Sequence, residues 1–141
     1  MTVRVANAQH EVRVNLSRMR RLAQSAVRQL KIRGPGIFSI TFIDSAAMRT
    51  LNRRFKKHDR LTDVLSFRYE GEPVVGDVLI SPRQAQAYAR EHAIAYTEEL
   101  SRYVVHGLLH WLGFKDRTLA QQRDMRARED RVLRNCGILV K

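Results

Sequence analysis

The chain is poor in cysteine, in long apolar runs and in acidic residues. Its 141 residues include one cysteine, Cys136. A lone cysteine excludes an internal disulfide and a cysteine-type zinc site, which fits a reducing compartment. The N-terminus has no apolar signal core, and the longest apolar stretch, beside His106, is too short and interrupted to span a membrane. We therefore expect a cytoplasmic protein with no membrane partner.

Acidic residues are outnumbered, with 14 Asp and Glu against 26 Lys and Arg, a net charge of +12. Such an excess favours a polyanionic partner, because phosphate contacts release counterions whatever the nucleotide sequence. The alternative is a basic surface that only keeps the protein soluble. No aromatic-rich strand typical of sequence-specific RNA readers is present. The sequence therefore predicts RNA binding that is electrostatic and weakly sequence-dependent.

The basic residues fall into three groups, and their positions distinguish them. The first two lie in residues 13–33 and 49–60, where acidic residues are scarce. The third, in residues 117–134, is mixed with Asp124, Glu129 and Asp130. This mixture predicts a solvated helix face with ion pairs rather than a binding surface.

The most informative pattern is His106 and His110, followed by Gly113 and Asp116. Histidines four residues apart on a helix differ by about 40° of rotation and one turn of rise, so their rings can bind one ion. Gly113 predicts a helix end whose left-handed turn can return Asp116 as a third ligand. Three ligands leave one position open, as in catalytic rather than structural zinc sites. The predicted site is therefore a metal that activates water.

The alternative is that both histidines are ordinary residues of a plain helix. A helical wheel favours the metal site, because Glu99 and Arg102 lie within about 40° of His106 while the opposite arc is almost wholly apolar. Thr97 is the predicted N-cap of this helix, with two glutamates in the first turn. The histidines thus lie away from the core stripe, on a face with ionisable neighbours.

Gly107 occupies the position at which a zinc protease of the His-Glu-x-x-His type carries its general base. A metallopeptidase is therefore disfavoured. Glu99 shares the metal face, but its backbone is about 10 Å from that of His106, and helical side chains lean toward the N-terminus. We interpret Glu99 as a supporting or salt-bridging residue more readily than as the base.

Periodicity predicts the elements of the fold. Alternation predicts short strands at 3–5 and 12–14, or two parts of one interrupted strand. Further along, the pattern predicts helices at 16–30, from 44 or 45, from 81 to about 92, at 97–113 and at 118–136, and strands at 37–43, 63–67 and 77–80. The chain is thus expected to form one compact α+β domain, 1–141, with a small mixed β-sheet of about four strands, about five helices and the metal site on a central helix.

Two blocks of sequence resemble the YbeY family of bacterial single-strand endoribonucleases, also described as ribosomal RNA maturation factors. The first runs from Leu51-Asn52 through the basic residues to Thr62-Asp63-Val64-Leu65-Ser66-Phe67, and the second from Gly76-Asp77 through Glu99-Leu100 to the histidine helix and Gly113-Phe114. Two positions depart from the family pattern, which has a histidine at Asp116 and an arginine at Lys56. Aspartate can ligate zinc, and two histidines with a carboxylate also suit ferrous iron.

The resemblance implies a cytoplasmic, zinc-dependent endoribonuclease that cleaves single-stranded RNA in small-subunit (16S) ribosomal RNA maturation and ribosome quality control. One zinc ion is the expected cofactor, with Fe(II) or another divalent metal left open. Lys56 and Glu99 are the catalytic candidates, and Arg53, Arg54 and Lys57 the RNA-binding ones. The general base stays open between His58 and Glu99.

Two other functions compete with this interpretation. One is a ribosome assembly or RNA-binding factor with a structural metal, against which the open fourth position argues. The other is the metallopeptidase, which Gly107 and the charge disfavour. The sequence indicates no oligomeric state.

Overall fold

The computed structural model describes residues 1–55, 63–71 and 73–140. Within them, one mixed sheet has the strand order β1-β2-β4-β3. The strands are β1 Thr2–Ala8, β2 Ile37–Ile43, β3 Val64–Arg68 and β4 Val74–Ile80. β1, β2 and β4 run parallel, whereas β3 pairs antiparallel with β4. The mixed four-stranded sheet expected from the sequence is confirmed.

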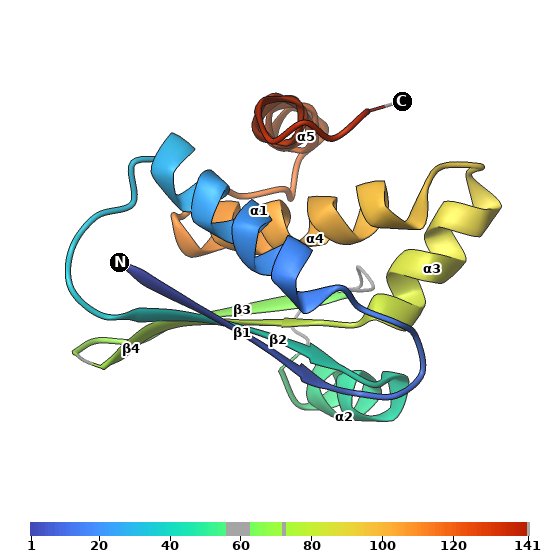
Figure 1. Ribbon diagram of the computed structural model, residues 1–141, viewed down its shortest axis with the longest axis horizontal. Helices are drawn as coiled ribbons and strands as arrows, with labels where there is room; N and C mark the ends of the chain where they lie inside the picture. Colours follow the sequence, from blue (N-terminus) through green and yellow to red (C-terminus); the bar gives the residue numbers. More distant parts are fainter. Residues whose placement is uncertain (56–62, 72, 141) are drawn as a thin grey trace.

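The helices of the described residues cover the sheet unequally (Figure 1). They are α1 Leu16–Gln29, α2 Ser45–Phe55, α3 Pro82–Glu91, α4 Tyr96–Trp111 and α5 Leu119–Asn135. Helices α1, α3 and α4 lie on one side of the sheet, α2 lies on the other, and α5 forms an outer layer beyond α1 and α4. The α+β class is therefore confirmed, and α4 is the central helix.

Helix α4 packs directly on the sheet because its apolar arc faces β3 and β4. Val104 and Leu108 are fully buried, as are Phe38 and Val78 of the sheet. A Cβ atom built on Gly107 would lie 2.5 Å from a methyl carbon of Val78, so only glycine allows this close approach. Gly107 is thus explained by packing between helix and sheet.

The strand expected at 12–14 is wrong. β1 ends at Ala8, and the chain turns after it. The buried side chain of Gln9 makes the hydrogen bonds to the turn backbone that a neighbouring strand would otherwise make. Its amide oxygen accepts hydrogen bonds from the backbone N–H groups of Glu11 and Val12, and its amide nitrogen donates to the Val12 carbonyl. A turn held by one side chain leaves no strand at this position.

The cap of α4 also differs from the prediction, because Ala95 rather than Thr97 is the N-cap, and no side-chain cap bond is present there. The residue between them, Tyr96, lies in the first turn, where its hydroxyl donates to the carbonyl of Arg13 across the fold at 3.1 Å. The N-cap therefore lies two residues before the predicted one. A tertiary contact accompanies this earlier start, and local sequence preference does not indicate it.

Other helix ends match the prediction. Asp44 accepts from the Ala47 amide at the start of α2, and Ser81 accepts from the Gln84 amide at the start of α3. Thr118 and Gln121 form both halves of a capping box at the start of α5. In the described ranges, none of the helices combines the length and apolarity that a membrane span needs.

Candidate metal centre

Three side chains converge at the C-terminal end of α4. Nε2 of His106 lies 3.5 Å from Oδ2 of Asp116, and Nε2 of His110 lies 3.4 Å from the same oxygen. Ligand atoms of the three residues all lie within 4.8 Å of one another. The side chains are 25%, 30% and 19% exposed, so an ion could reach them from solvent. The residues predicted as ligands are therefore brought together.

The turn after α4 returns the chain to the histidines. Gly113 has a φ of +106°, its amide donates to the carbonyl of His110, and the Phe114 amide donates to that of Leu109. These two bonds form a Schellman motif, the helix end that Gly113 predicts. Farther on, the amide nitrogen of Gln122 donates to the carbonyl of Asp116 at 3.1 Å. This hydrogen bond from α5 fixes the backbone of Asp116.

The same end of α4 is anchored to the sheet. Nε1 of Trp111 donates to the Val75 carbonyl at 3.0 Å, and Arg68 donates to the Trp111 carbonyl at 2.7 Å. The Arg68 guanidinium also lies 4.4 Å from the centre of the indole ring. These contacts to β3 and β4 hold the helical turn that carries His110.

The electrostatics of His110 favour the form that binds metal. Burial lowers its pKa, and the neighbouring charge of His106 lowers it further, while Asp116 and the hydrogen bond to the Phe114 backbone act in the opposite direction. The net effect is a pKa below the ordinary value. A neutral imidazole is the ligand for a metal ion, so no proton has to be displaced from this ring near neutral pH.

Glu129 of α5 is a residue that the sequence interpretation missed. Its Oε2 lies 2.5 Å from Nδ1 of His106, and its Oε1 accepts a hydrogen bond from Arg102 at 2.9 Å. It was expected on a solvated face, which is wrong, because it is only 4% exposed. The signal was its spacing from buried Met125 and Val132, which places Glu129 on the stripe of α5 that faces α4.

Glu99 lies inside the fold rather than in the group formed by His106, His110 and Asp116. It is 4% exposed, and its Oε1 is 4.0 Å from Nε of Arg102 with no hydrogen-bond partner among the described residues. Burial raises the pKa of Glu99 to about 7; Arg102 and Arg126 oppose the rise, and Glu129 and Glu98 add to it. The expectation of a salt-bridging position is met, and a catalytic role stays a prediction.

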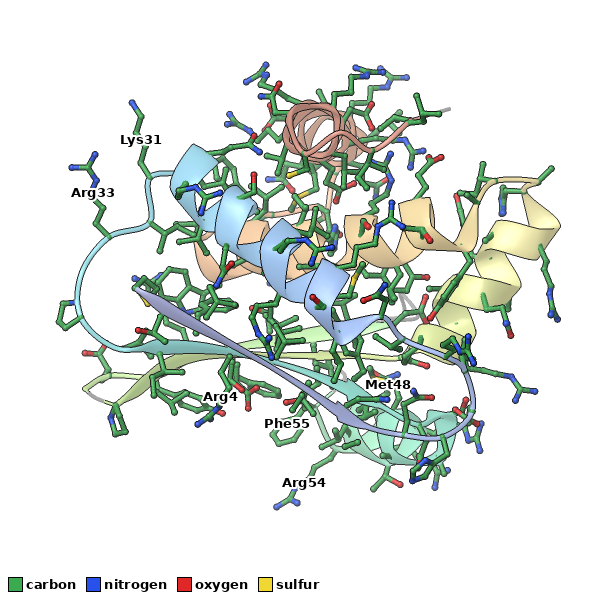
Figure 2. The ribbon with its side chains drawn as sticks, in the orientation of Figure 1. Arg4, Lys31, Arg33, Met48, Arg54 and Phe55 are labelled. Atoms are coloured by element: carbon green, nitrogen blue, oxygen red, sulfur yellow. The ribbon has the colours of Figure 1, made fainter. Side chains whose placement is uncertain are left out.

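The two predicted RNA-binding residues that the structure describes, Arg53 and Arg54, lie apart from α4. Arg53 and Arg54 are exposed in the last turn of α2, on the opposite side of the sheet (Figures 1 and 2). The Arg54 guanidinium is 5.6 Å from the ring centre of Phe55, which packs edge-on against Phe67. Lys56, Lys57 and His58 lie outside the described residues. Binding of RNA by this group stays a prediction.

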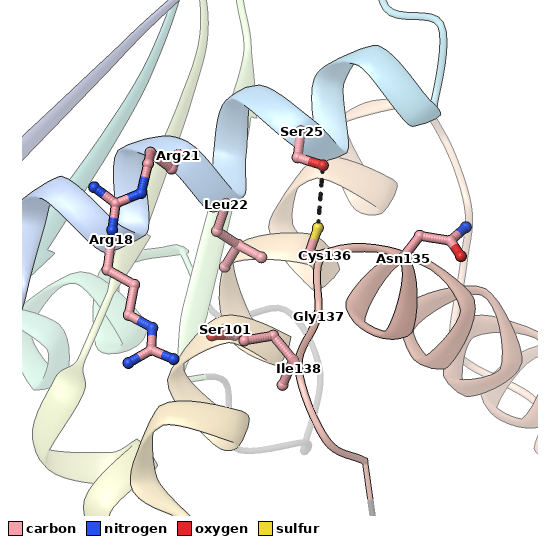
Figure 3. Close-up of a pocket in the computed structure, with 9 residues that line it drawn as sticks. All are labelled: Arg18, Arg21, Leu22, Ser25, Ser101, Asn135, Cys136, Gly137 and Ile138. Atoms are coloured by element: carbon pink, nitrogen blue, oxygen red, sulfur yellow. Dashed lines mark hydrogen bonds between the residues drawn. The ribbon is translucent and has the colours of Figure 1, made fainter.

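A pocket of about 340 Å³ lies elsewhere, between α1, α4 and the segment after α5 (Figure 3). Arg18 and Arg21 line one side, and Cys136 donates a 3.3 Å hydrogen bond to Ser25 across it. None of the three converging side chains, His106, His110 and Asp116, lines this pocket. It is therefore separate from the candidate metal centre.

The fold and site together define an α+β domain with a two-histidine, one-carboxylate group on its central helix. Residues 4–137 match the family described as Endoribonuclease YbeY, and the chain belongs to this family. Endoribonuclease YbeY of Moorella thermoacetica is 35% identical over 136 residues, 87% of each chain. That of Pelotomaculum thermopropionicum is 36% identical over 145 residues, 94% of this chain and 95% of the relative.

A solved structure supports the fold. The solution structure of TM1509 from Thermotoga maritima superposes with a TM-score of 0.62 and covers 95% of this chain and 91% of its own. At 23% sequence identity, this similarity establishes the shared fold.

Proposed function

We propose that this chain is a metal-dependent endoribonuclease that cleaves single-stranded RNA during small-subunit ribosomal RNA maturation and ribosome quality control. Membership of the Endoribonuclease YbeY family supports the reaction class. A net charge of +12 supports a polyanionic substrate. The cytoplasmic location and the ribosomal partner stay predictions.

The observation that carries the proposal is the convergence of His106, His110 and Asp116. Four ligands arranged tetrahedrally at about 2.1 Å from zinc lie about 3.4 Å from one another. The separations of 3.5 and 3.4 Å between Asp116 and the two histidines fit this geometry. We propose one zinc ion, while the same donor set also suits ferrous iron. When bound, the ion supplies Lewis acidity toward a phosphoryl oxygen and lowers the pKa of water.

Residues other than the three proposed ligands bind the RNA, neutralise charge on the phosphate and transfer protons. Arg53, Arg54 and Lys57 hold the RNA backbone, and Lys56 neutralises charge that develops on the phosphate during cleavage. Glu99 is a candidate for the general base, because its pKa of about 7 suits proton transfer near neutral pH. His58 is the other candidate.

The packing of Gly107 argues further against peptide hydrolysis. A side chain at this position would run into Val78 of the sheet rather than into the space beside the histidines. The general-base glutamate of a His-Glu-x-x-His protease therefore has no room here.

The test is cleavage of labelled RNA by zinc-loaded protein. Single-stranded and duplex RNA of the same sequence are incubated with wild type, with His110→Ala, and with His10→Ala as a matched control, since His10 is exposed and outside the site. We expect wild type and His10→Ala to cut single strands, and His110→Ala to cut neither. RNA binding without cleavage by the wild type would instead support an assembly factor with a structural metal.

A further inference from the structure

The two ring nitrogens of His106 have different neighbours. Nε2 lies 3.5 Å from Asp116, on the side where the ligand atoms converge. Nδ1 lies 2.5 Å from Oε2 of Glu129. A neutral imidazole carries a proton on one nitrogen and a lone pair on the other. The neighbours of His106 therefore decide which nitrogen is free to bind an ion.

Glu129 can only accept a hydrogen bond at this position. Its second oxygen is held by Nη1 of Arg102 at 2.9 Å, and Arg102 is itself held by Asp130 at 2.7 Å. Glu129 and Arg102 are each 4% exposed, so water does not compete for these bonds. The carboxylate is thus fixed from one side by a cation and presents its other oxygen to His106.

We propose that Glu129 is a positioning residue, which holds the His106 proton on Nδ1 and turns the lone pair of Nε2 toward the metal. The inference rests on the proposed metal site but makes a separate claim about the metal-free ring. An acceptor on the outer nitrogen of a ligand histidine fixes the ring and makes it a stronger donor to the ion. Arg102 acts one step further out, by fixing Glu129.

The chemistry of the amide makes Glu129→Gln a sharp test. Arg102 has only N–H donors, so it selects the amide oxygen of glutamine. The amide NH₂ group then faces Nδ1 of His106 and donates to it. The ring proton moves to Nε2, which removes the lone pair that would bind the ion. The variant is therefore expected to invert the tautomer of His106 at almost unchanged side-chain volume.

Asp130→Asn is the matched control. It removes one carboxylate from the same helix and the same arginine, at the residue next to Glu129, and the hydrogen bond that Asp130 accepts comes from Nη2 of Arg102. A role confined to holding α5 against α4 would make the two variants behave alike. A positioning role affects the Glu129 variant alone.

The experiment has two readouts. Nitrogen-15 NMR of the imidazoles in metal-free protein at alkaline pH reports the tautomer of His106. Chelator competition reports the zinc dissociation constant. We expect Nδ1–H in wild type and Asp130→Asn, Nε2–H in Glu129→Gln, and zinc binding weakened about 10- to 100-fold in Glu129→Gln only.

Two outcomes would overturn the inference. One is Nε2–H on His106 in the wild-type protein, a measurement that does not depend on any variant folding. The other is a Glu129→Gln protein, folded by circular dichroism, that binds zinc as tightly as Asp130→Asn. Wild type that binds no zinc would overturn the proposed function instead, and the tautomer of the metal-free ring keeps the two failures apart.

Discussion

Glu99 allows a quantitative prediction about stability and pH. Its carboxyl is buried, faces Arg102 at 4.0 Å, and has a pKa raised from 4.5 to about 7. Between these two values the folded protein retains a proton that the unfolded chain has lost. The free energy of unfolding therefore falls as pH rises through this window, is unaffected by Glu99 below about pH 4.5, and levels off above about pH 7.

The magnitude follows from the separation of the two pKa values. At about 1.4 kcal/mol for each pH unit, ionised Glu99 destabilises the fold by about 3 kcal/mol at high pH. Glutamine is uncharged throughout and has nearly the same shape as a protonated glutamate. Glu99→Gln is therefore expected to match wild type at pH 4.5 and to exceed its stability by up to about 3 kcal/mol at pH 8.5.

Urea unfolding of metal-free protein at a series of pH values measures the difference. Asp124→Asn is the control, since Asp124 lies on the exposed face of α5 with its side chain 55% exposed and pairs with Arg128. That variant should differ from wild type by less than about 1 kcal/mol at each pH. A gap between Glu99→Gln and wild type that is equal at pH 4.5 and pH 8.5 would refute the argument from burial.

Other substitutions test the site and its support. Asp116→Ala should release the metal whereas Asp116→His should retain it, and equal metal content in wild type and the alanine variant, by elemental analysis after dialysis, would exclude Asp116 as a ligand. Gly107→Ala should lose about 1–3 kcal/mol in urea unfolding, because its Cβ would meet Val78 at 2.5 Å, and unchanged stability would mean that α4 can shift. Lys56→Ala should reduce cleavage far more than RNA binding, and Lys56→Arg should retain or raise the rate; equal losses of both would make Lys56 a docking charge.

Much of the fold followed from local patterns. The strand Ile37–Ile43 was predicted at its observed bounds, because a run of β-branched and aromatic residues is typical of a buried strand. The failures involve distant contacts. Gln9 closes a turn in place of a strand at 12–14, and Tyr96 begins α4 through a bond to Arg13. No local pattern carries such information.

The site divides in the same way. His106, His110 and Asp116 fall within eleven residues, so helical spacing and one glycine turn predict their convergence. Glu129 lies 23 residues after His106 on a different helix, and glutamate amid arginines is typical of an exposed face. Its spacing from Met125 and Val132 indicates the buried stripe of α5, but only the packing of α5 on α4 shows that this stripe brings Glu129 to His106.

The geometry of the candidate centre is consequently a property of two helices. Both histidines belong to α4, Asp116 lies in the connection between α4 and α5, and Glu129 belongs to α5. The hydrogen bonds from Arg102 to Glu129 and Asp130 hold α5 against α4. They thereby also set the distance between the two helices that the segment containing Asp116 connects. A peptide comprising only residues 97–116 would retain every proposed ligand but would lack the carboxylate that orients His106. It should therefore bind zinc more weakly than the folded chain, because it lacks the Glu129 carboxylate beside Nδ1 of His106 and because it is less rigid.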